Sequence, residues 1–187
     1  MTFLDEGVSP YHVVESMKKR LEKSGYEGLD VKDSWTLNRG GKYYVDLGTT
    51  LIGFEIGEKA DHFRILGSHT DSPTFLIKPN ADIQFKNYQK LNTETYGGPI
   101  LNTWLDRPLS VAGRVDLKGD SVFETKAVLV DFEEPVAIIP NLAIHQNRTV
   151  NQGLELNKQK DMLPIIGLSG EKLEEHYFLN RLSEKIN

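Results

Sequence analysis

The chain has 187 residues and a mass of 21.2 kDa, with 39% hydrophobic and 26% charged residues, so it can bury an ordinary core and is neither disordered nor of low complexity. Its formal net charge of −5 argues against a protein held to DNA or RNA mainly by phosphate contacts, and no nucleic-acid partner is expected. The chain contains no cysteine, which excludes disulfides and thiolate nucleophiles, so any metal site must use His, Asp and Glu.

The amino terminus and the hydropathy pattern predict a cytoplasmic protein. The amino-terminal region has no apolar stretch long enough for a secretory signal, and Asp5 and Glu6 stand where positive charge is typical of one. No run of about 18 apolar residues occurs, so no membrane-spanning helix is expected. We therefore expect no membrane partner.

An amphipathic helix is predicted over residues 10–24. Ser9 is a favourable N-cap, Pro10 suits the first helical position, and Gly25 is a typical helix stop. Between them, apolar side chains recur at the helical spacing i, i+4 and i+8, at Val13, Met17 and Leu21.

Three short strands are predicted next, over residues 43–47, 50–56 and 62–68, because these segments are rich in aromatic and β-branched residues. The third strand runs into a polar stretch, residues 67–73, which ends at Pro73. In open α/β sheets, ligands bind at the carboxyl ends of strands. This position raises the functional interest of the polar stretch.

A mostly β unit is predicted over residues 80–140. Its expected strands are five short runs, at residues 82–86, 99–104, 110–117, 121–130 and 135–140. Residues 118–120, Lys-Gly-Asp, have the composition of a hairpin turn.

The last predicted element is a helix over residues 171–187. Its apolar residues fall on one side: Phe178, Leu182 and Ile186, with Leu173 and Tyr177 beside them. No capping glycine, proline or polar tail follows, so we expect the natural polypeptide to continue beyond Asn187.

The five histidines form no local zinc motif, because none lies in an H-E-x-x-H arrangement and zinc chemistry needs about three protein ligands. His12 and His176 lie in predicted helices among charged neighbours, and His62 follows Asp61 at the start of a predicted strand. We interpret these three histidines as surface residues.

His69 differs from the others because Asp71 lies two residues further on. In extended chain this spacing puts both side chains on one face, where the carboxylate can hold the second ring nitrogen of a metal-bound imidazole. The alternative is that Asp71 caps a turn with residues 72–73 while His69 packs at a strand end. From the spacing alone, this structural alternative is favoured.

Two further candidates lie in the β-rich region. Asp106 offers a carboxylate, but Arg107 follows it, and a structural ion pair or a turn explains the pair at least as well. His145 follows three apolar residues and precedes polar ones, so it is either a hydrogen-bond donor to a developing oxyanion or a polar residue at the edge of a core. The residues alone favour the second interpretation of His145.

Three segments taken together resemble the aspartyl aminopeptidase family, which includes vacuolar aminopeptidase I. They are residues 66–73 (LGSHTDSP), 96–115 (YGGPILNTWLDRPLSVAGRV) and 141–167 (NLAIHQNRTVNQGLELNKQKDMLPIIG). Their order and spacing also match, and the resemblance covers nearly the whole chain.

The resemblance implies an α/β fold: the start of a metallopeptidase α/β domain followed by an inserted, β-rich dimerisation domain. Residues 1–79 are then the amino-terminal part of the proteolytic domain, and residues 80–187 are part of the inserted domain. It also implies a metallo-aminopeptidase that removes the amino-terminal residue of peptides with metal-activated water. The cofactors would be two divalent metal ions, usually zinc in this family.

The same resemblance assigns roles to three residues. His69 matches the first metal-binding histidine, and Asp71 matches the catalytic carboxylate behind it. His145 matches a histidine that the inserted domain lends to the active site of a neighbouring subunit, where it binds substrate or stabilises the tetrahedral intermediate. Asp106 and Arg107 fall within the inserted domain, which favours their structural interpretation.

The family's remaining metal ligands and general base are expected beyond Asn187, so this portion alone should be inactive. The expected partners are a peptide with a free amino terminus and further copies of the chain, at least a dimer and up to the dodecamers known in the family. The alternative is a noncatalytic oligomerisation module derived from the same family. An unrelated small-molecule-binding domain is the weakest alternative.

Overall fold

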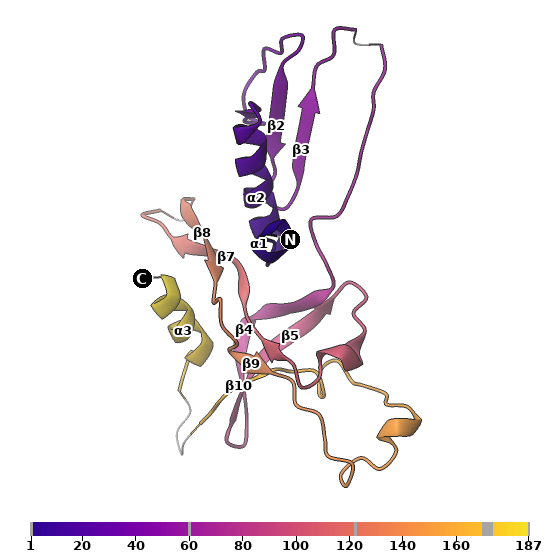
Figure 1. The fold of residues 1–187 in the computed structure, drawn as a ribbon. Coiled ribbons are helices and arrows are strands. Elements are labelled where there is room, and N and C mark those ends of the chain that lie inside the picture. The colour runs from indigo at the N-terminus through magenta and orange to yellow at the C-terminus, as the bar shows by residue number, and fades with distance from the viewer. Residues whose placement is uncertain (1, 60, 122, 170–173, 187) are drawn as a thin grey trace. The chain divides into compact units, whose positions relative to one another are not determined.

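The chain divides into two units in the computed structural model, which describes residues 2–59, 61–121, 123–169 and 174–186 (Figure 1). Unit 1 comprises Met1–Ser72 and Ala112–Leu129, and unit 2 comprises Pro73–Val111 and Val130–Asn187. The boundary expected between residues 79 and 80, which separates the proteolytic domain from the inserted domain, is not the same as this division into compact units and stays a prediction.

Unit 1 combines helices with a small mixed sheet. Its helices are α1 (Thr2–Glu6) and α2 (Pro10–Lys23), and its sheet has the order β1-β2-β3, with bounds Glu27–Leu29, Lys42–Asp46 and Leu51–Glu55. β1 runs parallel to β2, and β2 runs antiparallel to β3. Unit 1 also contains a separate two-stranded sheet from later in the chain, β7 (Ala112–Lys118) and β8 (Thr125–Asp131). The last two residues of β8 belong to unit 2.

Local signals set both ends of α2, as the sequence predicts. The Ser9 hydroxyl accepts a hydrogen bond from the His12 backbone N–H at 3.4 Å, which caps the first turn. Gly25 follows the helix with φ of +83°, and the Tyr26 N–H then donates to the Leu21 carbonyl at 3.0 Å. This backbone pattern is a Schellman motif, for which glycine is favoured because it adopts positive φ without a steric penalty.

Helix α2 packs on β2 and β3. The Tyr44 hydroxyl of β2 donates to the Glu22 carboxylate at 2.6 Å, and this hydrogen bond, together with burial, raises the pKa of Tyr44. Lys18 pairs with Asp46 at 2.9 Å. Gly53 of β3 leaves room for Leu21, whose nearest methyl carbon would lie 3.4 Å from a Cβ at that position.

Two of the three strands predicted in unit 1 are confirmed, because β2 and β3 match residues 43–47 and 50–56. The third prediction is wrong for this structure, because residues 62–68 belong to no strand. A strand needs a neighbour with which to exchange backbone hydrogen bonds, and no segment of the described chain pairs with these residues.

Unit 2 is built on a five-stranded sheet of order β4-β5-β10-β9-β6, in which each neighbouring pair is antiparallel. The strand bounds are β4 Thr74–Phe85, β5 Tyr88–Tyr96, β6 Pro108–Leu109, β9 Ala137–Ile138 and β10 Ile165–Leu168. Two 3-10 helices, η1 (Leu101–Trp104) and η2 (Val150–Gln152), and the helix α3 (Tyr177–Ile186) complete the unit.

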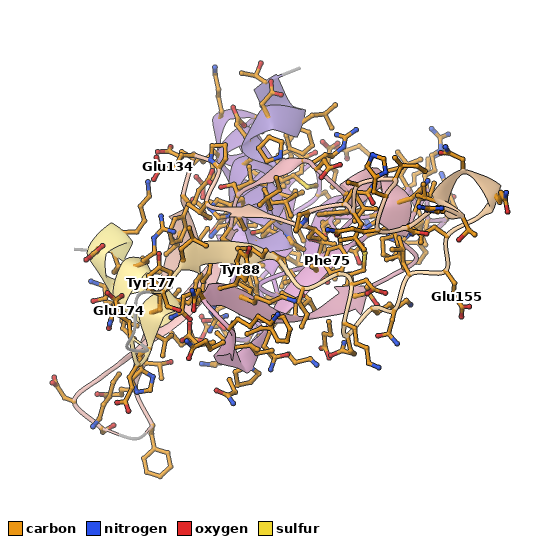
Figure 2. All side chains as sticks on the ribbon, turned by 90° about the horizontal axis from the view of Figure 1, so that it is seen from below. Phe75, Tyr88, Glu134, Glu155, Glu174 and Tyr177 are labelled. Carbon is orange, nitrogen blue, oxygen red and sulfur yellow. The ribbon has the colours of Figure 1, made fainter. Side chains whose placement is uncertain are left out.

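Helix α3 is anchored in unit 2 by aromatic packing and by a partly buried hydrogen bond to β4. Phe178 is 7% exposed and stacks on Phe132 with ring centroids 6.5 Å apart. The backbone N–H of Phe178 donates to the Asp82 carboxylate of β4 at 2.9 Å. Tyr177 lies against Gly167, where an added Cβ would come within 2.7 Å of the tyrosine hydroxyl (Figure 2).

The sequence predictions for unit 2 and the β7–β8 pair are confirmed in part. Four of the five expected runs overlap β4, β7, β8 and β9, and the connection between β7 and β8 includes Gly119, as the turn prediction requires. The strand predicted at residues 99–104 is wrong, because Leu101–Trp104 forms the 3-10 helix η1. Trp104 there packs edge-on against Phe75 of β4, with ring centroids 4.9 Å apart, and this non-local contact favours the 3-10 helix over a strand.

The final helix is shorter than predicted where it can be compared. It begins at Tyr177, and His176, which the sequence places inside the helix, lies just before it with φ of +59°. The His176 carbonyl still accepts a hydrogen bond from the Asn180 N–H at 2.8 Å, as the carbonyl of the residue just before a helix does. Residues 171–173, including Leu173, lie outside the described part of the chain.

Replacing Thr93 by valine is expected to stabilise the protein. Thr93 is 1% exposed in β5, and its hydroxyl has no hydrogen-bond partner among the described residues. Removing an unsatisfied buried hydroxyl while keeping the side-chain shape should raise the free energy of unfolding by about 1 kcal/mol. Urea unfolding measures this change. The exposed Thr125→Val variant is the control, expected within about 0.5 kcal/mol of the parent, and a destabilised Thr93→Val variant would contradict the prediction.

Candidate functional site

His69 and Asp71 of unit 1 contact each other in the way that their spacing predicts. The Nδ1 atom of His69 lies 2.8 Å from the Oδ1 atom of Asp71. The His69 side chain is 89% exposed, whereas that of Asp71 is 29% exposed. Between them, the Thr70 hydroxyl donates to the Thr49 carbonyl at 2.7 Å, which ties this stretch to the turn before β3. The structural alternative requires the His69 ring to pack at a strand end. The exposure of the ring does not agree with that alternative.

This contact suits His69 to bind a metal ion. A carboxylate can only accept a hydrogen bond, so Nδ1 is the donor in the contact. In the neutral ring, Nε2 then carries the free electron pair, on a side chain open to solvent. A carboxylate behind a metal-binding histidine fixes the tautomer and increases the basicity of the ligand.

One imidazole is not a metal centre. Within the described part of the chain, no group of three or more His, Asp or Glu side chains is placed to hold a metal ion. Of the other histidines, His12 contacts the Ser9 hydroxyl at 2.8 Å, and the Nδ1 atom of His62 contacts the Asp61 carboxylate at 2.6 Å, as His69 contacts Asp71. The residues present therefore fit one donor of a zinc site and not a complete one.

His145 lies in unit 2, on the long connection between β9 and η2. Its turn is closed by the Gln146 N–H, which donates to the Ala143 carbonyl at 2.8 Å. The His145 side chain is exposed, and the preceding Leu142 and Ile144 are 57% and 46% exposed. His145 is thus presented to solvent on a loop and is not buried at the edge of a core.

Asp106 anchors the start of the connection between β9 and η2, residues 139–149, which we call the His145 loop. It has φ of +59°, a conformation that asparagine and aspartate tolerate better than most residues. Its N–H donates to the Ile139 carbonyl and its carboxylate accepts the Asn141 N–H, both at 2.9 Å. These contacts agree with the structural interpretation of Asp106. They also show that Asp106 positions the loop that carries His145. The LDRP sequence offered only the turn as a signal for this role.

A hollow of about 650 Å³ lies beside the same loop in unit 2. Its walls come from η1, η2 and the adjoining chain, and include Leu101, Asn102, Asn141, Val150, Asn151 and Leu154. None of the residues lining it is titratable, so this hollow offers no acid, base or metal ligand of its own.

Comparisons with known proteins identify the family of this chain. Residues 3–184 match the family described as "Aminopeptidase I zinc metalloprotease (M18)". The chain belongs to the M18 family. A curated relative from Clostridium novyi (strain NT), "Probable M18 family aminopeptidase 2", is 46% identical over 193 residues. That match covers 100% of this chain and 45% of the relative, so this M18 chain spans less than half of the relative's length.

Solved structures share the fold of this M18 chain. The cryo-EM structure of the Ape4 and Nbr1 complex matches with a TM-score of 0.86 and 33% identity, over 94% of this chain and 34% of that one. The "Structure of S. cerevesiae mApe1 dodecamer" matches with a TM-score of 0.70 and 28% identity, over 91% and 37%. The mixed α/β fold expected from the sequence is therefore confirmed at the level of the family.

Within the described residues, no helix is both long enough and apolar enough to cross a membrane. The cytoplasmic location stays a prediction.

Proposed function

We propose that this chain supplies one metal donor and a substrate-contacting histidine to a zinc aminopeptidase. The observation that supports this most is the 2.8 Å contact between Asp71 and the exposed His69, in a chain that belongs to a zinc metalloprotease family. In this proposal the enzyme holds two divalent ions, and the other donors come from the part of the full-length protein that has no counterpart here. Asp71 keeps His69 in the tautomer that binds metal.

His145 is the second functional residue in this proposal. It donates a hydrogen bond to the oxygen of the scissile carbonyl as negative charge develops there, from the inserted domain of a neighbouring subunit. Its exposure on the His145 loop supports this role, because a group that reaches another subunit must lie at the surface. Asp106 acts on it indirectly, by holding the start of the loop.

The proposal includes self-association of at least two copies. Unit 2 exposes large apolar side chains along and near the His145 loop, including Ile100, 70% exposed, and Leu142, 57% exposed. Such side chains are typical of surfaces that other proteins cover. The S. cerevisiae relative forms a dodecamer, which supports a homo-oligomer here. The same surface favours the alternative function, a noncatalytic oligomerisation module.

A peptidase assay on two forms of the protein separates these functions. We expect the full-length protein that contains this chain to release the first residue from peptides with a free amino terminus when zinc is present. We expect N-acetylated peptides to resist, because the free amino group is part of what an aminopeptidase binds. The 187-residue chain alone should release nothing, because it lacks the other metal donors.

The controls decide between the outcomes. Chelation followed by zinc addition should abolish and restore the activity of the full-length protein. Equal cleavage of acetylated peptides would contradict the aminopeptidase proposal. A full-length protein that forms oligomers but hydrolyses no peptide at saturating zinc would support the oligomerisation module instead.

A further inference from the structure

Thr70 lies between the two residues of the candidate site, and its side chain bonds to a different part of unit 1. The His69 ring and the Asp71 carboxylate contact each other at 2.8 Å. The Thr70 hydroxyl instead donates to the backbone carbonyl of Thr49 at 2.7 Å. The middle residue of the site is thus bonded twenty-one positions away, while its two neighbours are bonded to each other.

The carbonyl that accepts this bond belongs to a well-ordered turn. Thr49 lies in the connection between β2 and β3, residues 47–50. Within it, the Leu47 N–H donates to the Thr50 carbonyl at 2.9 Å, and the Gly48 N–H donates to the Asp46 carboxylate at 2.8 Å. Gly48 has φ of +86°, which glycine adopts without a steric penalty. The turn therefore has a defined backbone conformation.

The same turn is tied to the strands and to helix α2. β2 and β3 pair along their whole length, from Lys42 opposite Glu55 to Asp46 opposite Leu51 (Figure 1). Asp46 also pairs with Lys18 of α2 at 2.9 Å, and both side chains are partly buried, which limits the screening of the pair by water. A continuous series of contacts thus leads from α2 through the turn to Thr70.

The contact between His69 and Asp71 cannot by itself place the metal donor. It joins residues two positions apart, so it orients the ring relative to its own stretch of chain and not relative to the rest of unit 1. The His69 side chain is 89% exposed, so packing does not hold it either. Residues 69–71 make no backbone hydrogen bond to another described residue. The bond from Thr70 to the turn supplies the missing attachment.

We propose that Thr70 is a positioning residue of the metal site: its hydroxyl holds the backbone of the pair formed by His69 and Asp71 in a set place relative to the turn between β2 and β3. This inference rests on the proposed function, in which His69 binds metal. A ligand placed in advance costs less conformational entropy to order when the metal binds. Asp71 selects the tautomer of the ring, and Thr70 selects its position.

The test is the zinc dissociation constant of the full-length protein, measured by competition with a chromophoric chelator. Thr70→Val removes the hydroxyl and keeps the shape of the side chain, so the dissociation constant should rise about tenfold, the lower end of the range for groups that orient a metal ligand. Thr70→Ser keeps a hydroxyl that can donate and should bind zinc like the parent. Thr70→Ala removes the same hydroxyl and replaces Thr70→Val if valine prevents folding.

The chain offers the same bond outside the site as a control. The Thr103 hydroxyl of η1 donates to the Ile100 carbonyl, also at 2.7 Å. Thr103→Val should leave zinc affinity unchanged. Thermal unfolding in EDTA compares the stability of all the variants without metal. A Thr70→Val variant that lowers the unfolding temperature and leaves zinc affinity unchanged would show a purely structural role and overturn the proposal. Equal weakening in Thr70→Ser and Thr70→Val would also overturn it, because the hydroxyl would then not be responsible.

Failure of this inference differs from failure of the proposed function. A parent protein that hydrolyses peptides, with the same zinc affinity in Thr70→Val, contradicts the positioning role alone. A parent protein that hydrolyses no peptide, but whose zinc binding is weakened by Thr70→Val and kept by Thr70→Ser, contradicts the peptidase proposal alone. A parent protein that binds no zinc contradicts both.

Discussion

If the full-length protein is the proposed aminopeptidase, replacing its His145 by phenylalanine is expected to lower turnover by about 10²–10³-fold, the loss that follows removal of one hydrogen-bond donor to a developing oxyanion. Zinc content should not change, because His145 is not proposed as a ligand. The measurement is kcat beside metal analysis of the same sample. Gln146→Ala changes the exposed neighbour in the same turn and should leave turnover unchanged. Unchanged turnover in His145→Phe would contradict the role.

Mixing two inactive variants tests whether His145 acts in a neighbouring subunit. His69→Ala removes the metal donor, and His145→Phe removes the donor to substrate. If the two residues of one active centre come from different subunits, a mixed dimer contains one centre with both histidines intact. Random mixing should then restore about a quarter of wild-type turnover, since half of the dimers are mixed and half of their centres are intact. No recovery would place both histidines in one subunit.

Asp71→Asn is expected to weaken zinc binding by the full-length protein about 10–100-fold. The amide keeps the shape of the carboxylate but removes its charge, and its NH₂ group can donate to Nδ1 and so favour the wrong tautomer of His69. Competition with a chromophoric chelator measures the zinc dissociation constant.

The chain offers a matched control for this variant. Asp61 contacts the Nδ1 atom of His62 at 2.6 Å, which is the same chemistry outside the candidate site. Asp61→Asn should leave zinc affinity unchanged. Equal weakening in the two variants would show that Asp71 acts only through overall charge, and no weakening in Asp71→Asn would contradict its role behind a metal ligand.

Features governed by near neighbours in the sequence could be predicted. Helix α2 begins and ends where Ser9 and Gly25 indicate, because a cap and a left-handed turn depend on a few adjacent residues. The contact of His69 with Asp71 follows from the period of an extended chain, although the spacing alone favoured a structural role. The roles of His69, Asp71 and His145 came from the family resemblance and still await these tests.

β5 shows what the sequence could not indicate. Its inward face carries Gln89, Leu91 and Thr93, each 1–2% exposed, so polar residues occupy buried positions and hide the alternation that marks a strand. Its register is set by β4 and by β10, which is more than sixty residues further along the chain. No local pattern records such a pairing.

The sequence by itself determined the caps of α2 and the composition of most strands, because each depends on residues within a few positions of one another. It offered the contact between His69 and Asp71 only as the less favoured of two interpretations. Only the tertiary structure decided which segments become strands. Residues 62–68 have the composition of a strand and remain unpaired, whereas β5 has a poorer pattern and lies between two neighbours. The physical reason is that a strand is stabilised by hydrogen bonds to another segment, so its existence depends on a partner and not on its own residues alone.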